Sequence, residues 1–428
     1  MVAKNLNELP AAKIASAIAA GEFTAEDVMR DCLVRIEARE SALSAWACFD
    51  PELAMAEARA SDKAPAKGVL HGVPIGVKDV IDTSDYPTEM GSPIYRGHRP
   101  QTDAACVAQL RAAGAIILGK TVTCEFAGMT PAATRNPLDP ARTPGGSSSG
   151  SAAAVADHMV PIALGTQTRG SILRPASYCG IVGYKPSFGL VARAGLKFAA
   201  ESFDTIGVLA RTIDDVQLSA SVLFGAPRAT MQALSSPPTI GVCRDGLDRS
   251  ENESEKALED ATARLGAAGA RLQPFAFPDD VGDFTAATKV INDVERARAI
   301  AWEWRTKPDL ISDRMRATIE EGLRTPSEKY IAALRLMEDS RTRIRAGFDG
   351  IDIVLAPCVN GEAPVGIDYT GDPFFQGLWT ALHLPTISIP SHFGPSGLPV
   401  GIQLVGRKYE DEALLAAARW VFARVRNK

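Results

Sequence analysis

Short apolar segments alternate with helix-like stretches along most of this chain, and this alternation restricts the folds open to it. The run from Val73 to Val77 is followed by a helical pattern through Val107 and Leu110 and by a second apolar run, Ala115 to Leu118. Strand, crossover helix and strand in this order indicate two parallel neighbours in one sheet. Similar runs occur at Val160 to Leu164, Thr239 to Val242, Ile351 to Leu355, Thr386 to Ile389 and Val400 to Val405. The sequence therefore predicts a layered α/β fold.

The remaining chain is mostly helical in its spacing. A helix is expected from the N-cap Thr24 to about Glu40, and others over Glu255 to Leu265, Ser327 to Phe348 and Glu410 to Val425. The stretch from Phe284 to Phe348 holds no convincing strand, so we expect a helical layer that covers the sheet.

No internal repeat and no convincing linker divides the 428 residues, although length alone would allow two or three domains. We predict one domain over residues 1–428. Its expected parts are N-terminal helices in 1–68, a core with the chemical motifs in 69–234, and a helical layer with C-terminal strands in 235–428.

Composition excludes several classes of partner. The net charge is −5, and lysines and arginines are scattered rather than clustered, which argues against nucleic acid or an anionic membrane and favours a small neutral or anionic substrate. The seven cysteines form no C-x-x-C pair, the five histidines form no metal pair, and no apolar run approaches the roughly 18 residues that span a bilayer. We predict a cytoplasmic protein with reduced thiols that needs no metal and no cofactor.

The most unusual segment is a Gly/Ser loop, Thr143 to Ser151, which leads into the Ala-rich stretch Ala152 to Ala156. Such a loop at the start of a helix presents free N–H groups and hydroxyls to one point. A phosphate-binding loop would need a lysine after Gly150 and has none. A nucleophile elbow is formally matched but lacks the buried strand before it. A flexible solvated loop would be the simplest interpretation if the segment stood alone.

It does not stand alone, because two further segments each end an apolar strand candidate. Val77-Lys78-Asp79 precedes the loop, and Gly165 to Pro175 follows it. Together the three resemble the amidase-signature family, with a strand-end lysine, a Gly-Gly-Ser-Ser-x-Gly-Ser loop, and a second serine 24 residues after the first loop serine (171 − 147 = 24). The likeness runs from about residue 70 to 186 and resumes at 397–406. It implies one large domain with a mixed, mostly parallel central sheet covered by helices on both faces.

The resemblance also implies a catalytic relay of Lys78, Ser147 and Ser171. An amide carbonyl is a poor electrophile, so the Ser171 hydroxyl has to lose its proton as it attacks. In this family the base is a lysine acting through a bridging serine whose peptide bond is cis, here Lys78 and Ser147. The lysine must be neutral, which requires burial to lower its pKa from about 10.4.

Supporting roles follow from the same resemblance. Backbone N–H groups of Thr168, Arg169, Gly170 and Ser171 are expected to form the oxyanion hole. Two further hydroxyls, those of Ser148 and Thr166, either support the relay or are merely satisfied loop groups.

Departures from the family pattern Asp-x-Gly-Gly-Ser-Ile-Arg bear on the substrate. This chain has Gln167, Arg169 and Leu173 at the first, third and last of those places. The Arg169 side chain could bind an anionic substrate, turn outward into solvent, or strain the turn, and we expect the outward position. The pattern resembles the malonamidase branch, in which the arginine three residues after the nucleophile, here Arg174, binds the substrate carboxylate; the alternative is that it holds neighbouring backbone.

Three functions remain open from the sequence. The first is a stand-alone amidohydrolase that cleaves a small carboxamide through an acyl-enzyme on Ser171. The second is the amidotransferase subunit of a tRNA-charging complex, which shares the relay. The third is a catalytically impaired relative that serves as a binding protein, an option raised by Arg169. The sequence leaves the oligomeric state open; a homodimer is common among the relatives that the chain resembles and is one option here.

Overall fold

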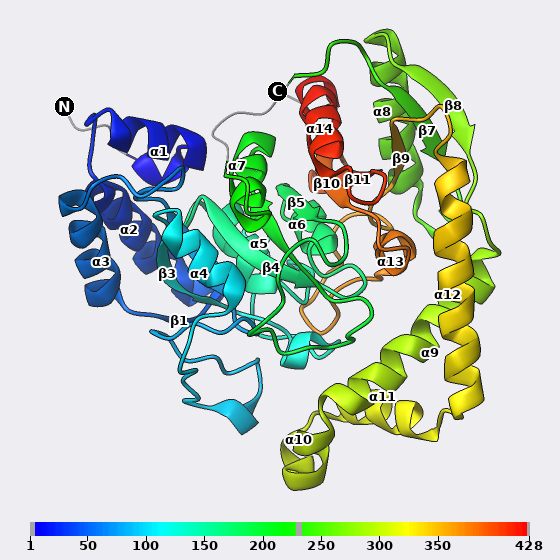
Figure 1. Ribbon diagram of the computed structural model, residues 1–428, viewed down its shortest axis with the longest axis horizontal. Coiled ribbons are helices and arrows are strands. Elements are labelled where there is room, and N and C mark those ends of the chain that lie inside the picture. Colours follow the sequence, from blue (N-terminus) through cyan, green and yellow to red (C-terminus); the bar gives the residue numbers. More distant parts are fainter. Residues whose placement is uncertain (1–4, 228–232, 426–428) are drawn as a thin grey trace.

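The computed structural model describes residues 5–227 and 233–425 and is built on a single sheet of eleven strands (Figure 1). In the order in which they lie side by side, the strands are β1 (Trp46–Phe49), β3 (Ile116–Thr121), β2 (Pro74–Lys78), β4 (Ile162–Gln167), β6 (Thr205–Ala210), β5 (Val182–Lys185), β10 (Thr386–Phe393), β11 (Pro399–Val405), β9 (Ile353–Pro357), β7 (Thr239–Cys243) and β8 (Arg271–Phe275). All seven strands expected from the apolar runs are present.

The sheet is mixed, as expected, but the expectation that it is mostly parallel is wrong. Six of its ten strand pairings are antiparallel. The central strands β5 and β6 escaped the sequence analysis, and β10 and β11 pair as an antiparallel hairpin. A run of apolar residues identifies a strand but carries no information about its direction.

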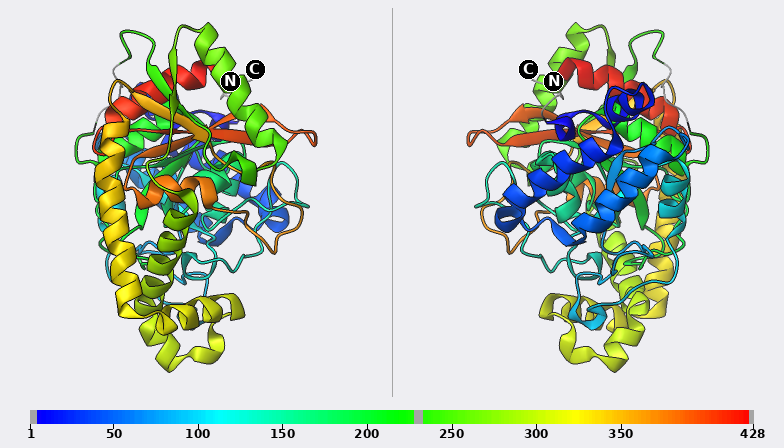
Figure 2. Two further views of the ribbon diagram at one scale, coloured as in Figure 1. Left: turned by 90° about the vertical axis from the view of Figure 1, so that its right-hand side faces the viewer. Right: turned by 90° about the vertical axis from the view of Figure 1, so that its left-hand side faces the viewer.

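Helices cover both faces of the sheet (Figures 1 and 2). They are α1 (Ala11–Ala19), α2 (Ala25–Leu43), α3 (Pro51–Lys63), α4 (Ala105–Ala112), α5 (Ser149–Ala156), α6 (Leu173–Tyr178), α7 (Ile213–Leu223), α8 (Asn252–Ala267), α9 (Val281–Ala299), α10 (Ala301–Thr306), α11 (Asp313–Arg324), α12 (Ser327–Gly347), α13 (Phe374–Ala381) and α14 (Asp411–Val425). Helix α14 packs against both α7 and α8 on one face, whereas α5 and α6 lie on the face that carries the site described below.

Helix α2 shows how local sequence sets these elements. It begins directly after Thr24, whose hydroxyl accepts a hydrogen bond from the Asp27 N–H at 3.1 Å while the Asp27 carboxylate accepts one from the Thr24 N–H. This reciprocal capping box satisfies two otherwise unpaired N–H groups. The predicted apolar face is buried through Val28, Cys32 and Ile36. The expected N-cap and face are both confirmed.

The segment expected to form a helical layer is helical throughout but covers the sheet only in part. Helix α12 packs through Met337 and Ile344 into a smaller apolar core around Trp379 and Phe275. Helices α10 and α11 instead lie at the end of the molecule away from the sheet, with α11 packed on α9 (Figures 1 and 2). This packing is close: Gly322 of α11 lies so near the backbone of α9 that a side chain would clash with the Asp293 carbonyl.

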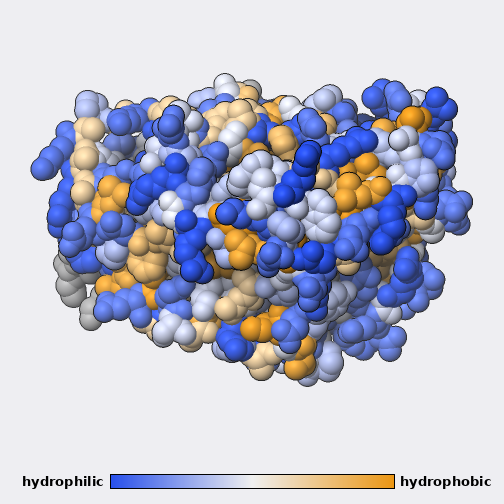
Figure 3. Space-filling model, turned by 90° about the horizontal axis from the view of Figure 1, so that it is seen from below, coloured by the Kyte–Doolittle hydropathy of each residue, from blue (hydrophilic) through white to orange (hydrophobic). Residues whose placement is uncertain are grey.

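The surface at the α10–α11 end is mostly hydrophilic, with apolar residues scattered in small groups (Figure 3). Such a distribution is ordinary for a solvated face. All seven cysteines are free thiols, and all except Cys48 are buried. Within the described ranges, no helix is both long and apolar enough to cross a membrane.

Candidate active site

The three sequence motifs meet at one edge of the sheet. Strands β2 and β4 are parallel neighbours, with Val77 opposite Leu164, so the ends that carry Lys78 and Thr166 lie together. The Gly/Ser loop reaches the same edge because α5, which it opens, packs against both strands. Residues about 70 and 90 positions apart in the sequence therefore share one site.

The Lys78 side chain is fully buried and is held by hydroxyl groups. Its Nζ lies 2.8 Å from Ser147 Oγ and 2.7 Å from Thr166 Oγ1. No carboxylate oxygen lies within 4 Å of this nitrogen in the described ranges. Burial therefore lowers the pKa of Lys78 to about 7. A substantial fraction of the amine is neutral at neutral pH, as a general base requires.

Ser147 and its neighbour Ser148 are fixed at the bottom of the loop. The Gly146–Ser147 peptide bond is cis, as the family resemblance implied. Ser148 Oγ contacts both the N–H and the carbonyl oxygen of Thr166, at 3.3 Å each. Ser148 and Thr166 thus join the loop to strand β4, and Thr166 also binds the lysine directly. Both predicted supporting hydroxyls lie in the site.

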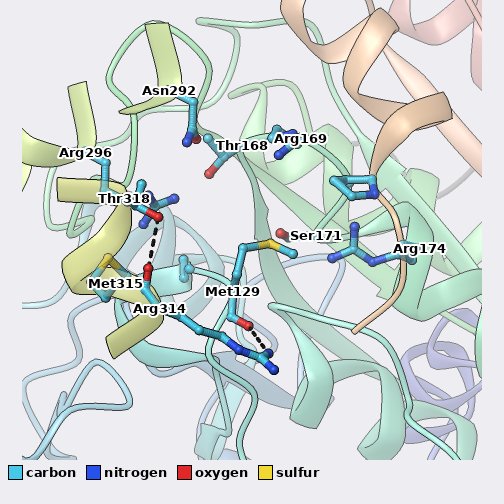
Figure 4. Close-up of a pocket in the computed structure, with 14 residues that line it drawn as sticks. Met129, Thr168, Arg169, Ser171, Arg174, Asn292, Arg296, Arg314, Met315 and Thr318 are labelled. Carbon is cyan, nitrogen blue, oxygen red and sulfur yellow. Dashed lines mark hydrogen bonds between the residues drawn. The ribbon is translucent and has the colours of Figure 1, made fainter. Parts of the chain in front are cut away.

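Ser171 lies on the turn between β4 and α6 and lines a pocket (Figure 4). Its carbonyl oxygen accepts a hydrogen bond from the Ser148 N–H at 3.2 Å, which ties the turn to the Gly/Ser loop. No side-chain hydrogen bond joins Ser147 to Ser171 in the described part of the chain. Catalytic hydrogen bonds are often loose before substrate binds, so the final link of the relay is one that substrate binding has to tighten.

The turn that holds Ser171 presents unpaired N–H groups. Those of Arg169, Gly170 and Ser171 have no partner in the described ranges, whereas the next two N–H groups along the chain are taken by Gln167 Oε1 at 2.9 and 3.0 Å. Gln167 therefore fixes the turn and leaves its donors free. The Thr168 hydroxyl donates a hydrogen bond to Asp204 Oδ1 at 2.5 Å, which fixes the position of Thr168. Free donors at one point can stabilise a developing oxyanion.

The pocket beside Ser171 is strongly cationic. It encloses about 470 Å³ of empty space, part of it open to solvent. Four arginines and no acidic residue line it. The lining residues are Ala127, Gly128, Met129, Thr168, Arg169, Gly170, Ser171, Arg174, Asn292, Arg296, Arg314, Met315, Thr318 and Pro373. The expectation that Arg169 turns outward into solvent is wrong, because its side chain is partly buried and lies against this pocket (Figure 4).

Arg174 holds neighbouring backbone, which is the alternative role considered for it. The side chain is 2% exposed, and its Nη2 donates to the Gly146 carbonyl at 2.6 Å and to Thr370 Oγ1 at 3.3 Å. Its Nε and Nη1 are buried and have no partner within the described residues. The arginine therefore holds the Gly/Ser loop with Nη2, while two further donor nitrogens remain unpaired.

Several residues of the site were missed by the sequence analysis. Asn292 and Arg296 line the pocket from α9. On α13, Thr380 hydrogen-bonds to Gln167 and Arg169, and Gln376 lies next to Gly170. Asn292 and Arg296 lie four residues apart on one helical face, and buried polar residues at this spacing are the only signal that would have pointed to them. The α13 residues lie about 200 positions from the turn, so no local pattern could have found them.

The pKa of Lys78 gives a testable pH dependence. Below about pH 7 the amine is protonated and cannot accept a proton, so kcat/KM for a neutral amide such as butyramide should fall about tenfold per pH unit and should level off above about pH 8. Lys185 is a matched control, since burial also lowers its pKa to about 7 but it binds the carbonyl oxygens of Pro186 and Leu384. In a folded Lys185→Met variant, kcat/KM should still fall below about pH 7, as in the wild type. A profile that is flat from pH 5.5 to 8 would contradict the assignment of Lys78.

Comparisons with known proteins agree with this geometry. The family model described as Amidase matches residues 27–415. The chain is 34% identical over 455 residues to a glutamyl-tRNA(Gln) amidotransferase subunit from Chloroflexus aggregans, covering 94% of this chain and 93% of that protein. It is 33% identical over 452 residues to the putative amidase AmiD of Mycobacterium tuberculosis, covering 98% and 94%. A solved structure described as an amidase superposes with a TM-score of 0.90 at 30% identity, covering 98% of this chain and all of that one.

Proposed function

The chain belongs to the Amidase family, and from this premise we propose that it is a stand-alone amidase that hydrolyses a small, carboxylate-bearing carboxamide through an acyl-enzyme on Ser171. The observation that carries the proposal is the buried Lys78 amine, which has no acidic partner within the described ranges and contacts Ser147 Oγ at 2.8 Å. A lysine in this setting is a base rather than a structural cation.

The proposed reaction uses only groups of this site. The Ser171 oxygen bonds to the amide carbon while its proton passes to Ser147, whose own proton passes to the neutral Lys78. The free N–H groups of Arg169 and Gly170 stabilise the oxyanion that forms. The C–N bond then breaks as the leaving nitrogen receives a proton back along the same route. Water attacks the resulting ester by the same steps and releases the carboxylate.

The substrate class follows from Arg174. Its unpaired, buried Nε and Nη1 are cationic N–H donors, and a substrate carboxylate is a suitable acceptor for such a donor. The small cationic pocket favours an anionic acyl group of modest size. These features support the malonamidase-like branch of the family. We also propose that the protein is cytoplasmic, since seven free thiols suit a reducing compartment, and that it forms a homodimer.

A second candidate is an amidotransferase subunit of a tRNA-charging complex, which the similarity to the Chloroflexus aggregans protein favours. Such a subunit functions with partner chains, so a tagged copy expressed in its native host should retain them. Purification of a single species that is fully active on small amides would exclude this candidate.

Labelling with a fluorophosphonate tests the main proposal directly. This reagent phosphonylates an activated serine, so mass spectrometry should find one adduct, on Ser171, and the labelled protein should release no ammonia from malonamate or succinamate. Modification of another residue would reject the assignment of the nucleophile. Labelling without ammonia release from any amide in a broad panel would instead favour a catalytically impaired binding protein.

A further inference from the structure

Three buried or partly buried arginines surround Ser171 without acidic partners. Within the described ranges, no carboxylate oxygen lies within 4 Å of the guanidinium of Arg169, Arg174 or Arg296. Arg174 is 2% exposed and Arg296 is 5% exposed. Removing a cation from water is costly unless it is paired, so such a group of arginines is expected to be completed by anions from outside the chain.

The contacts of the three side chains leave most of their donors for a ligand. Arg296 uses Nη1 to donate to the Phe126 carbonyl at 3.0 Å. The Arg169 side chain makes no hydrogen bond to any described residue, although its backbone is anchored by the Thr380 hydroxyl, which donates to the Arg169 carbonyl at 2.8 Å. The backbone of Arg169 is therefore fixed, while the N–H donors of its side chain are left for a ligand.

The charge of Arg169 acts on both of the other arginines. Burial lowers the pKa of Arg174 and of Arg296, and the charge of Arg169 lowers both further. In Figure 4, Arg174 and Arg296 lie on opposite sides of Ser171, and Arg169 lies on the same turn as the serine. The repulsion among these cations would be relieved by anionic groups on the substrate.

The acidic residues whose charges act on this group include Asp204, Asp293 and Asp372, and each is engaged elsewhere. Asp204 accepts hydrogen bonds from a threonine hydroxyl and two backbone N–H groups, Asp293 pairs with a lysine at 2.5 Å, and Asp372 accepts from the first N–H of α13 at 3.0 Å. None reaches ion-pair distance of an arginine in the pocket. A single carboxylate on Arg174 would leave the other two cations without an anionic ligand.

We propose that Arg169 and Arg296 form a second anion subsite beside the nucleophile, so that the preferred substrate is a monoamide that carries two carboxylates, one bound by Arg174 and the other by this pair. Asn292 and Thr318 line the same side of the pocket. The Asn292 amide donates one N–H to Asp293 Oδ1 and has a second, whereas the Thr318 hydroxyl donates to the Arg314 carbonyl. The inference rests on the proposed amidase function and narrows its substrate. Arg169 acts here as a substrate-binding residue, while its backbone N–H stays in the oxyanion hole.

A matched series of amides tests the subsite. Butyramide carries no carboxylate, succinamate carries one, and the terminal monoamide of propane-1,2,3-tricarboxylic acid carries two on a similar carbon chain. Wild-type kcat/KM, measured by ammonia release, should rise along this series, with a gain of about tenfold or more between the last two. The Arg169→Met variant should lose about 10- to 100-fold more of its kcat/KM on the two-carboxylate amide than on succinamate or butyramide.

Controls separate this proposal from the underlying one. Arg169→Met should still be labelled on Ser171 by a fluorophosphonate, which shows an intact relay, and Arg305→Met removes one exposed charge from α10 and should leave the preference unchanged. Equal losses on all three amides, or no wild-type preference for the second carboxylate, would overturn the subsite while leaving the amidase function standing. Absence of both labelling and ammonia release in the wild type would overturn both.

Discussion

Replacing Ser171 with alanine is expected to lower kcat for amide hydrolysis by about 10⁴- to 10⁶-fold, because no oxygen remains to form the acyl-enzyme. The substitution removes one hydroxyl from a side chain that is 8% exposed, so the fold should persist. Ammonia release gives the rate, and mass spectrometry should find no fluorophosphonate adduct.

Ser149 provides a matched control in the neighbouring loop. Its hydroxyl makes only a 3.5 Å contact with the Val122 carbonyl, so Ser149→Ala should change kcat by less than about threefold. If Ser171→Ala kept more than about a hundredth of wild-type activity, another nucleophile would have to be sought.

The Lys78→Met substitution should remove activity to a similar extent, about 10³- to 10⁵-fold, because the relay then ends without a base. It should also abolish the acid limb of the pH–rate profile in whatever activity remains. The methionine keeps the length and volume of the lysine chain, so loss of packing is not the cause. Residual activity that still falls below pH 7 would assign the limb to a different group.

The same substitution is expected to lower activity but to raise stability at acidic pH. Burial holds the pKa of Lys78 at about 7 in the folded protein, against about 10.4 when unfolded, so the unfolded chain binds more protons between these values. The cost to folding therefore grows as the pH falls from about 10 to 7, reaches about 4 kcal/mol near pH 7, and changes little below pH 6. The substitution also removes two hydrogen bonds, each worth about 1 kcal/mol. The free energy of unfolding of Lys78→Met at pH 6 should therefore exceed that of the wild type by about 2 kcal/mol. Denaturant unfolding at pH 6 and pH 9 measures the difference, and a variant less stable at pH 6 would contradict it.

Much of the site could be predicted because its motifs are local. Lys78 ends a strand, and Ser147 and Ser171 occupy turns whose composition and spacing are distinctive; the structure brings all three motifs to one sheet edge. Most strands with continuous apolar runs could also be located, although the buried strand β6 was missed. Short or polar strands such as β8, which contains Pro274 and buries only Phe275, carry no such signal.

The wall of the pocket could not be predicted from the sequence. Arg296 comes from a helix whose spacing indicates simple cover for the sheet, and the Arg169 side chain is expected in solvent because a lone arginine is usually solvated. Its actual position depends on packing between the turn, α9 and α13, which lie far apart along the chain. Contacts of this kind arise only when the chain is folded.

The division of labour around the pocket has a consequence for how such an enzyme can diversify. The reacting groups come from residues 78–174, whereas Asn292, Arg296, Arg314 and Thr318 come from the separate helical arm of α9 and α11. Mutations in that arm can alter which acyl group is accepted without disturbing proton transfer. Part of the selectivity can therefore change independently of the chemistry, whereas Arg169 and Arg174 lie on the segment that also carries the nucleophile.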